Sequence, residues 1–141
     1  MAFLTKEELK TVSTTELINK LTANDDSIID DIIDESISLM KGYLSKYYDV
    51  ELIFSTTGDN RHKTVLKKLK DIVIYEIYER HTREQNQVAK RRFDEAMLWL
   101  ENLNKGEFYD RTLPAIPSTN DVANNSNDIR YGGYTRFTSK Y

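Results

Sequence analysis

The feature that most constrains the fold is a run of apolar residues spaced by three and four positions between residues 28 and 47. Its members are Ile28, Ile29, Ile32, Ile33, Ile37, Met40, Tyr43, Leu44 and Tyr47. This spacing puts them on one face of an α-helix, whereas a half-buried strand would alternate at every second residue. Although Ile is β-branched, we therefore predict a helix over residues 27–47 that is about 30 Å long.

The same spacing predicts two more long helices. One covers residues 62–81 and the other residues 83–104. Their apolar positions are Val65, Leu66, Leu69, Ile72, Val73 and Ile77, with Tyr75 beside them, and then Val88, Ala89, Phe93, Ala96, Met97, Leu100 and Leu103. Gly106 follows the last helix, where a left-handed residue commonly ends a helix.

Shorter elements precede and connect these helices. A hydroxyl residue followed three positions later by Glu is a capping box, and it occurs at Thr5–Glu8 and again at Ser13–Glu16. Both predict short N-terminal helices. Residues 49–63 are a connection, in which residues 50–54 are predicted to be extended and residues 55–60 to form a turn.

After Gly106 the helical period stops, and both prolines and an Asn/Ser-rich stretch follow. We predict an all-α fold: a small bundle of two long central helices, a third long helix and short N-terminal helices, in a domain of residues 1–106. Residues 107–141 are predicted to be an extended docking tail, because clustered aromatics in a polar segment suit anchoring on another surface. The predicted docking residues are Tyr131, Tyr134, Arg136, Phe137 and Tyr141.

The residue types exclude several kinds of chemistry. The 141 residues include no Cys, which excludes disulfides, thiolate catalysis and Cys-ligated zinc. His62 and His81 lack a second ligand at three or four residues' distance, and no acid–base partner is visible for either. Asp30 and Asp34 share a helical face that we expect to be turned to water, without the converging cage that a hard cation needs. We therefore expect no enzymatic activity, no metal and no cofactor. No run of about 18 apolar residues occurs, so no membrane span is expected either.

Charge is distributed unevenly along the chain. Residues 25–35 contain six acids and no base, whereas residues 61–92 contain ten Lys and Arg against four acids. An acidic face on one copy can meet a basic face on the next, although two solvated helix faces would give the same pattern. The residues predicted for these inter-subunit faces are Asp30, Asp31, Asp34, Lys67, Lys68 and Arg91.

The order of the helices resembles a family of small head–tail adaptor proteins of Mu-like prophages and related tailed phages. The resemblance covers roughly residues 3–106. It rests on residues 4–9 (LTKEEL), 37–48 (ISLMKGYLSKYY), 69–78 (LKDIVIYEIY) and 92–100 (RFDEAMLWL), followed by Gly106.

The resemblance implies a virion structural protein at the head–tail interface, assembled in the bacterial host cytoplasm. It implies a homo-oligomeric ring, with twelve copies expected, on the portal protein, joined in turn by the next connector, stopper or tail protein. DNA would pass through the channel without sequence-specific binding. Two alternatives remain open from the sequence: a small helical nucleic-acid-binding or regulatory protein, and a carboxylate metalloenzyme built on Asp30 and Asp34.

Overall fold

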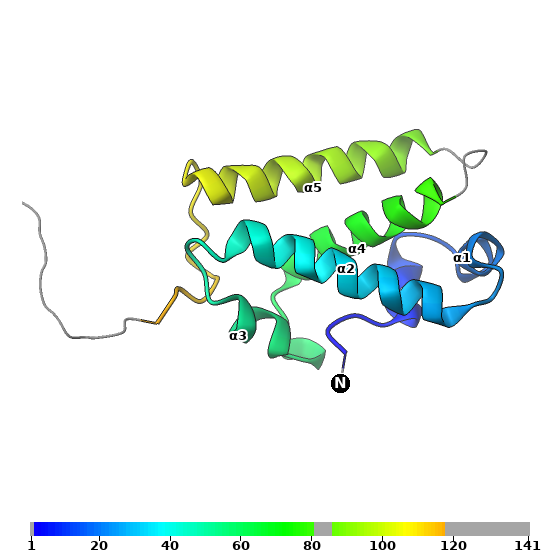
Figure 1. Cartoon of the computed structure of the whole chain (residues 1–141), viewed down its shortest axis with the longest axis horizontal. Helices are drawn as coiled ribbons and strands as arrows, with labels where there is room; N and C mark the ends of the chain where they lie inside the picture. Colours follow the sequence, from blue (N-terminus) through cyan, green and yellow to red (C-terminus); the bar gives the residue numbers. More distant parts are fainter. Residues whose placement is uncertain (1, 81–85, 118–141) are drawn as a thin grey trace, which may run out of the picture.

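The computed structural model describes residues 2–80 and 86–117, which form helices joined by short connections (Figure 1). No β-strand occurs in this part of the chain; Tyr48 and Ala115 form an isolated antiparallel bridge. The predicted all-α class is confirmed. In chain order, with η marking a 3-10 helix, the elements are η1 (Lys6–Thr11), α1 (Thr15–Thr22), α2 (Asp26–Leu44), α3 (Val50–Ser55), η2 (Gly58–Asn60), α4 (Lys63–Glu79) and α5 (Gln87–Lys105).

The three long helices make up the body of the protein. Helix α4 packs against both α2 and α5, and α2 also contacts α5. In Figure 1, α5 lies above α2, α1 lies at one end of the body and α3 lies toward the other. The predicted bundle of three long helices preceded by short N-terminal helices is therefore confirmed.

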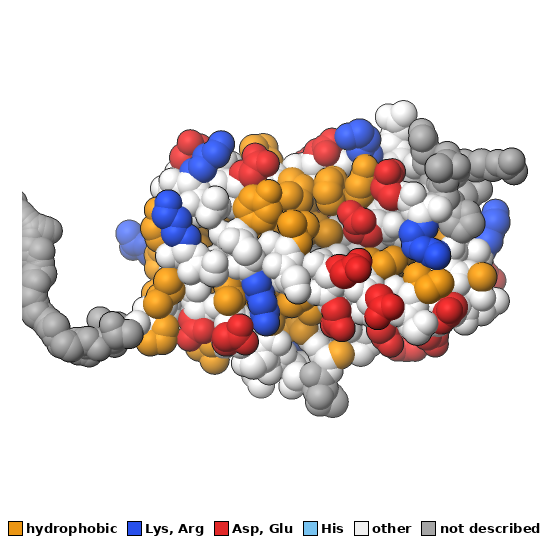
Figure 2. All heavy atoms as spheres, viewed as in Figure 1, with side chains coloured by type: hydrophobic (Ala, Val, Ile, Leu, Met, Phe, Trp, Pro, Cys, Tyr) orange, Lys and Arg blue, Asp and Glu red, His pale blue; other side chains and the backbone are white. Residues whose placement is uncertain are grey.

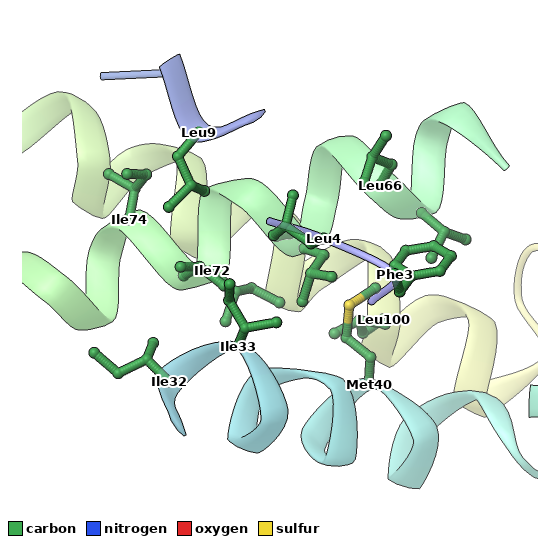
Figure 3. Close-up of a cluster of buried hydrophobic side chains, with 14 of the residues drawn as sticks. Phe3, Leu4, Leu9, Ile32, Ile33, Met40, Leu66, Ile72, Ile74 and Leu100 are labelled. Carbon is green, nitrogen blue, oxygen red and sulfur yellow. The ribbon is translucent and has the colours of Figure 1, made fainter. Parts of the chain in front are cut away.

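The predicted apolar stripes meet in one core. In Figure 3, Ile33 of α2 points toward Ile72 of α4, while Phe3 and Leu4 of the N-terminal segment enter between the helices. Burying a side chain of this size contributes about 1.5–3 kcal/mol, so these stripes supply most of the stabilisation. The fully buried members include Leu9, Ile29, Met40, Val65, Leu69, Ile72, Val73, Ala96, Leu100 and Leu103.

Polar side chains fix where the helices begin. The Asp25 carboxylate accepts a hydrogen bond from the Ser27 amide at 3.0 Å, at the start that the sequence indicates for α2. Helix α1 is capped by Thr14, one residue after the predicted Ser13. Gly106, with φ of 79°, ends α5 in the left-handed conformation, as predicted.

The prediction of an extended segment over residues 50–54 is wrong, because these residues form α3. The Asp49 carboxylate caps this helix by accepting from the Leu52 amide at 3.1 Å. Ile53 is buried, whereas Leu52 is 51% exposed. Three consecutive apolar residues, Leu52, Ile53 and Phe54, hide the helical period, and the packing of α3 against α2 decides the conformation.

Residues 107–117, which we call the C-terminal strap, run back along the body. The Asp49 amide donates to the Pro114 carbonyl and the Asp110 amide donates to the Tyr48 hydroxyl, both at 2.9 Å. Leu113 is buried in the core, so the first part of the predicted docking tail packs on the body of its own chain. The division of the chain after residue 106 into a body and a docking tail stays a prediction, and residues 118–141 lie outside the described residues.

Candidate interaction surfaces

A groove lined with cations lies where η1, α4 and α5 meet. Its volume is about 620 Å³. We call this surface the basic groove. Its charged lining consists of Lys10, Arg61, Lys63, Lys67, Lys70 and Arg92, together with Glu8 and Asp71.

The local sequence explains three of the six cations in this lining. Lys63, Lys67 and Lys70 follow one another by four and three residues, so they share one face of α4. Lys10 comes from η1 and Arg92 from α5, which are distant in sequence and meet α4 only through the packing of the bundle. The groove is therefore a product of the tertiary fold built around a face that the sequence already shows.

Both carboxylates in the groove are held by a cation. Glu8 lies 2.6 Å from Arg61, whose guanidinium also donates to the Phe3 carbonyl at 2.7 Å. The hydrogen bond from Arg61 lowers the pKa of Glu8 to about 2, against an opposing effect of burial. Asp71, 3% exposed, accepts from Lys67 at 3.3 Å, while its Oδ1 has no hydrogen-bond partner within the described part of the chain.

Four cations of the groove are left without a carboxylate from inside it. Lys70 donates to the Thr11 hydroxyl at 3.1 Å, and Lys63 lies 3.9 Å from the fully exposed Asp59. For Lys10 and Arg92, the described residues provide no ion pair. With six bases against two acids, the groove has an excess of positive charge and suits an anionic partner.

The opposite charge gathers on α2. Asp30, Asp31, Asp34 and Glu35, which we call the acidic face, are all exposed. Figure 2 shows acidic side chains over the half of α2 nearest α1, with apolar side chains beside them between α2 and α5. Within residues 2–80 and 86–117, none of the four forms an ion pair.

The raised pKa of Glu76, a neighbouring residue on α4, reflects the negative charge on this side of the protein. Burial raises the pKa of Glu76 on α4, and the charges of Glu79 and Glu35 raise it further. Glu76 and Glu35 line the same shallow hollow between α4 and α2. Negative charge thus continues from the acidic face of α2 onto the adjoining side of α4.

The structure brings together some of the predicted interface residues and separates others. Asp30, Asp31 and Asp34 lie together, and Lys67 lines the basic groove. Lys68 is half-buried and Arg91 is exposed on α5, but neither belongs to the groove lining. The predicted docking residues Tyr131, Tyr134, Arg136, Phe137 and Tyr141 lie outside the described residues, as does His81.

Of the six cations in the groove, only Lys67 is among the residues predicted for the inter-subunit faces; Lys10, Arg61, Lys63, Lys70 and Arg92 are not. The spacing of Lys63, Lys67 and Lys70 is sufficient to predict a row of cations, since these positions share a helical face. No sequence signal pairs Arg61 with Glu8, because the two are brought together by the packing of η1 on the body.

The described residues show no assembled centre for metal chemistry. No group of three or more His, Asp or Glu side chains among them converges to hold an ion. His62, one of the two histidines, accepts from the Val65 amide through Nδ1 at 3.3 Å and meets the Thr112 hydroxyl through Nε2 at 2.6 Å. Its ring thus caps α4 and contacts the strap. Among the described helices, none is both long and apolar enough to cross a membrane.

The fold and these surfaces define a small helical protein that carries two oppositely charged faces. The chain belongs to the family described as Bacteriophage Mu, Gp36, which it matches over residues 3–130. It is therefore a Mu-like phage protein, of a family that points to particle structure or morphogenesis. No curated protein and no solved structure matches the chain.

Proposed function

We propose that this protein is a structural component of the virion, a head–tail connector that forms a ring on the portal vertex around the DNA channel. The observation that carries the proposal is the match to the Bacteriophage Mu, Gp36 family over residues 3–130, which takes in the whole helical body. In this proposal the ring, with twelve copies expected, sits between the portal protein and the next connector, stopper or tail protein, and its role is not catalytic.

The two charged surfaces support an assembly role. The acidic face and the basic groove are different patches of one chain, so contact between them joins copies head to tail. Such heterologous contacts close into a ring when the rotation between copies is right. Neither surface needs a cofactor or a catalytic centre for this function.

We propose further that residues 118–141 dock on the portal protein or on a neighbouring copy. The strap leads the chain to the side of α3, where Leu52 and Ile116 are exposed by 51% and 49%. Buried aromatic and arginine side chains provide much of the binding energy in protein interfaces. The residues proposed as anchors are Tyr131, Tyr134, Arg136, Phe137 and Tyr141.

The connector role is tested in the phage by deleting the gene and in vitro with purified portal rings. The deletion is expected to leave DNA-filled heads and free tails that do not join, and the protein is expected to add a ring to the portal in electron micrographs. Infectious particles assembled without the protein, or virions that lack it, would contradict the proposal.

The docking of the C-terminal segment is tested by removing residues 127–141. Circular dichroism is expected to show unchanged helix content, while binding to portal rings is lost. A matched control replaces only Asn124 and Asn125 by Ser, which keeps the length and the aromatic residues and should bind normally. Normal binding by the truncated chain would show that the anchors lie elsewhere.

A second candidate function, nucleic-acid binding, is favoured by the basic groove. Lysine and arginine side chains that neutralise phosphates give an affinity that falls steeply with salt concentration. The overall charge of −3 and the two carboxylates inside the groove oppose this function. Titration of a labelled DNA duplex at several salt concentrations separates it from the connector role, which requires no measurable affinity of the free protein for DNA.

A further inference from the structure

We infer that the basic groove of one copy receives the acidic face of α2 from a second copy of this chain. The inference deepens the connector proposal and rests on it, because a ring requires one repeated contact between different patches of the same protein. It names the two patches, the residues that meet and the direction of assembly.

The charges of the two surfaces match in number. Inside the groove, Glu8 neutralises Arg61 and Asp71 neutralises Lys67. The cations left without a carboxylate from the groove are Lys10, Lys63, Lys70 and Arg92, of which Lys63 lies 3.9 Å from the fully exposed Asp59. The acidic face offers four carboxylates in return, and the part of the chain that the structure describes pairs none of them with a cation.

The two surfaces lie on opposite sides of α4, so one chain cannot satisfy itself. Lys63, Lys67 and Lys70 face the groove, whereas Ile72 and Glu76 face α2 across a shallow hollow. Nine residues separate Lys63 from Ile72, which is about two and a half turns of helix, so their directions differ by about half a turn. A carboxylate of the acidic face must therefore reach the groove of another copy.

The spacing of the charges also matches. On α2, Asp30 and Asp34 are one turn apart, as are Asp31 and Glu35, which gives two rows with a step of about 6 Å along the helix axis. On α4, Lys63, Lys67 and Lys70 follow at steps of about 6 and about 4.5 Å, which are close to this spacing. One row of carboxylates can thus meet a row of ammonium groups turn by turn.

Apolar side chains border both surfaces. Leu39 follows Glu35 by one turn on α2 and is 38% exposed. In the groove, Val12 and Leu66 lie among the cations. Contact between these residues excludes water at the edge of the ion pairs and strengthens them, since charges attract more strongly where the surroundings are less polar.

A protein helix suits the groove better than a phosphodiester chain does. Asp71 lines the groove and its Oδ1 has no donor within the described residues. Phosphodiester oxygens and carboxylates both only accept hydrogen bonds and both repel Asp71 and Glu8, so a partner that also brings a donor is favoured. Helix α2 presents exposed Ser38 as well as carboxylates, so it brings donors and acceptors together.

The contact is expected to be weak in solution and sensitive to salt. Exposed ion pairs contribute little individually and are screened within about 8–10 Å at physiological ionic strength. Copies therefore dissociate when dilute and assemble when they are concentrated, as on a ring-shaped partner that holds them close together.

Exchange of charge between the surfaces tests the inference directly. One full-length variant carries Asp30→Lys and Asp34→Lys, and the other carries Lys63→Glu and Lys70→Glu, which leaves the Lys67–Asp71 pair intact. Sedimentation velocity at millimolar protein and low salt is expected to show self-association of the unaltered chain, and at least tenfold weaker association for each variant alone. An equimolar mixture of the two variants is expected to associate again, since each reversed surface then meets its complement.

Matched controls separate this pairing from a general effect of charge. Glu95→Lys with Lys105→Glu changes two exposed residues of α5 outside both surfaces and is expected to associate like the unaltered chain. Circular dichroism and thermal melting of every variant verify that the helices are retained. Raising the salt concentration is expected to weaken the unaltered chain and the rescued mixture alike.

The possible results separate this inference from the connector role. The proposed contact is overturned if the unaltered chain does not associate, if the reversed variants associate normally, or if their mixture does not recover association. It is also overturned if the groove binds a DNA duplex and only the groove variant loses association. If the protein is nevertheless present in virions, the connector role stands without this interface. If the exchange succeeds but virions form without the protein, the interface stands and the connector role fails.

Discussion

The three long helices and the two terminal segments are stabilised in different ways. Helices α2, α4 and α5 share a core in which stabilisation is spread over many apolar side chains. Residues 3–11 at the N-terminus place Phe3, Leu4 and Leu9 in that core, and the C-terminal strap places Leu113 there. Both segments depend otherwise on a few individual polar contacts. Two adjacent residues of the body hold one terminal segment each. Arg61 binds the Phe3 carbonyl and Glu8 of the N-terminal segment, while His62 meets Thr112 of the strap.

This difference teaches where a single substitution acts. Loss of one polar contact among the three long helices is expected to change the free energy of unfolding little. The stability there comes from buried apolar surface, which is not directional and is shared by many side chains. Loss of one contact at a terminus can release the whole segment while the helices stay folded, since protein structures open locally where few contacts hold a segment. The following tests probe this contrast, beginning with the largest expected effect.

Leu69→Ala is expected to destabilise the whole body. Leu69 is fully buried on α4, and truncation of such a leucine to alanine costs about 2–5 kcal/mol of unfolding free energy. Urea denaturation followed by circular dichroism measures the loss. Leu98→Ala is the matched control, because Leu98 is 58% exposed, and its effect should stay within about 0.5 kcal/mol. Equal losses of unfolding free energy for the two substitutions would contradict the role given to the buried core in stabilising the long helices.

Leu113→Ala is expected to release the strap without unfolding the helices. Leu113 is 4% exposed and anchors residues 107–117, so its loss is expected to cost about 2–3 kcal/mol. Hydrogen exchange measures the result residue by residue. The Asp49 amide, which donates to Pro114, should lose protection, while amides in the middle of α4 keep theirs. Uniform loss of protection over the body would show that the strap and the helices unfold together.

The contact between Glu8 and Arg61 is expected to make stability depend on pH in acid. The pKa of Glu8 is lowered from 4.5 to about 2 by the hydrogen bond from Arg61, so its contribution is complete above pH 4.5 and disappears as the pH falls to about 2. The side chain is 30% exposed, and after allowance for solvent screening we expect about 1–2 kcal/mol.

The variant Glu8→Gln isolates this contribution. Between pH 4.5 and 2 the unaltered chain should lose about 1–2 kcal/mol more unfolding free energy than the variant does. Glu16→Gln, at an exposed position at the start of α1, serves as the control and should follow the unaltered chain. Parallel curves for the unaltered chain and Glu8→Gln would contradict the role given to this ion pair.

Tyr48→Phe is expected to have the smallest effect of the four, about 1 kcal/mol, because it removes the acceptor of the Asp110 amide and keeps the buried ring. The change should appear as faster exchange of the Asp110 amide. Tyr43→Phe provides a control on α2, where the ring is half-buried. A larger loss for Tyr43→Phe than for Tyr48→Phe would argue against the strap contact.

Much of the fold could be predicted from the sequence, because each long helix carries its own apolar stripe. Ile29, Leu69 and Leu100 are buried as their spacing indicates. Helix α3 was missed since six residues are too few to show a period. The packing of Leu113 was missed because nothing near it in the sequence shows that Tyr48 and Asp49 would receive the strap.

Less of the candidate site could be predicted. The exposure of Asp30, Asp31 and Asp34 follows from their place opposite the apolar stripe of α2, and Lys67 shares its helical face with Lys63. Arg92 and Lys10 join that face only because α5 and η1 pack on α4. Arg91 and Lys68, chosen for their charge alone, lie outside the groove.

The sequence by itself determined the three long helices, the start of α2 at Asp25 and the Gly106 terminus of α5, because these features depend on groups within a few residues of one another. Only the tertiary structure decided that Arg61 binds Glu8, that the strap returns to Tyr48, and that the acids and bases occupy opposite sides of α4. Contacts of that kind join residues far apart in the chain, so they form only once the apolar faces of the helices have packed together in one arrangement.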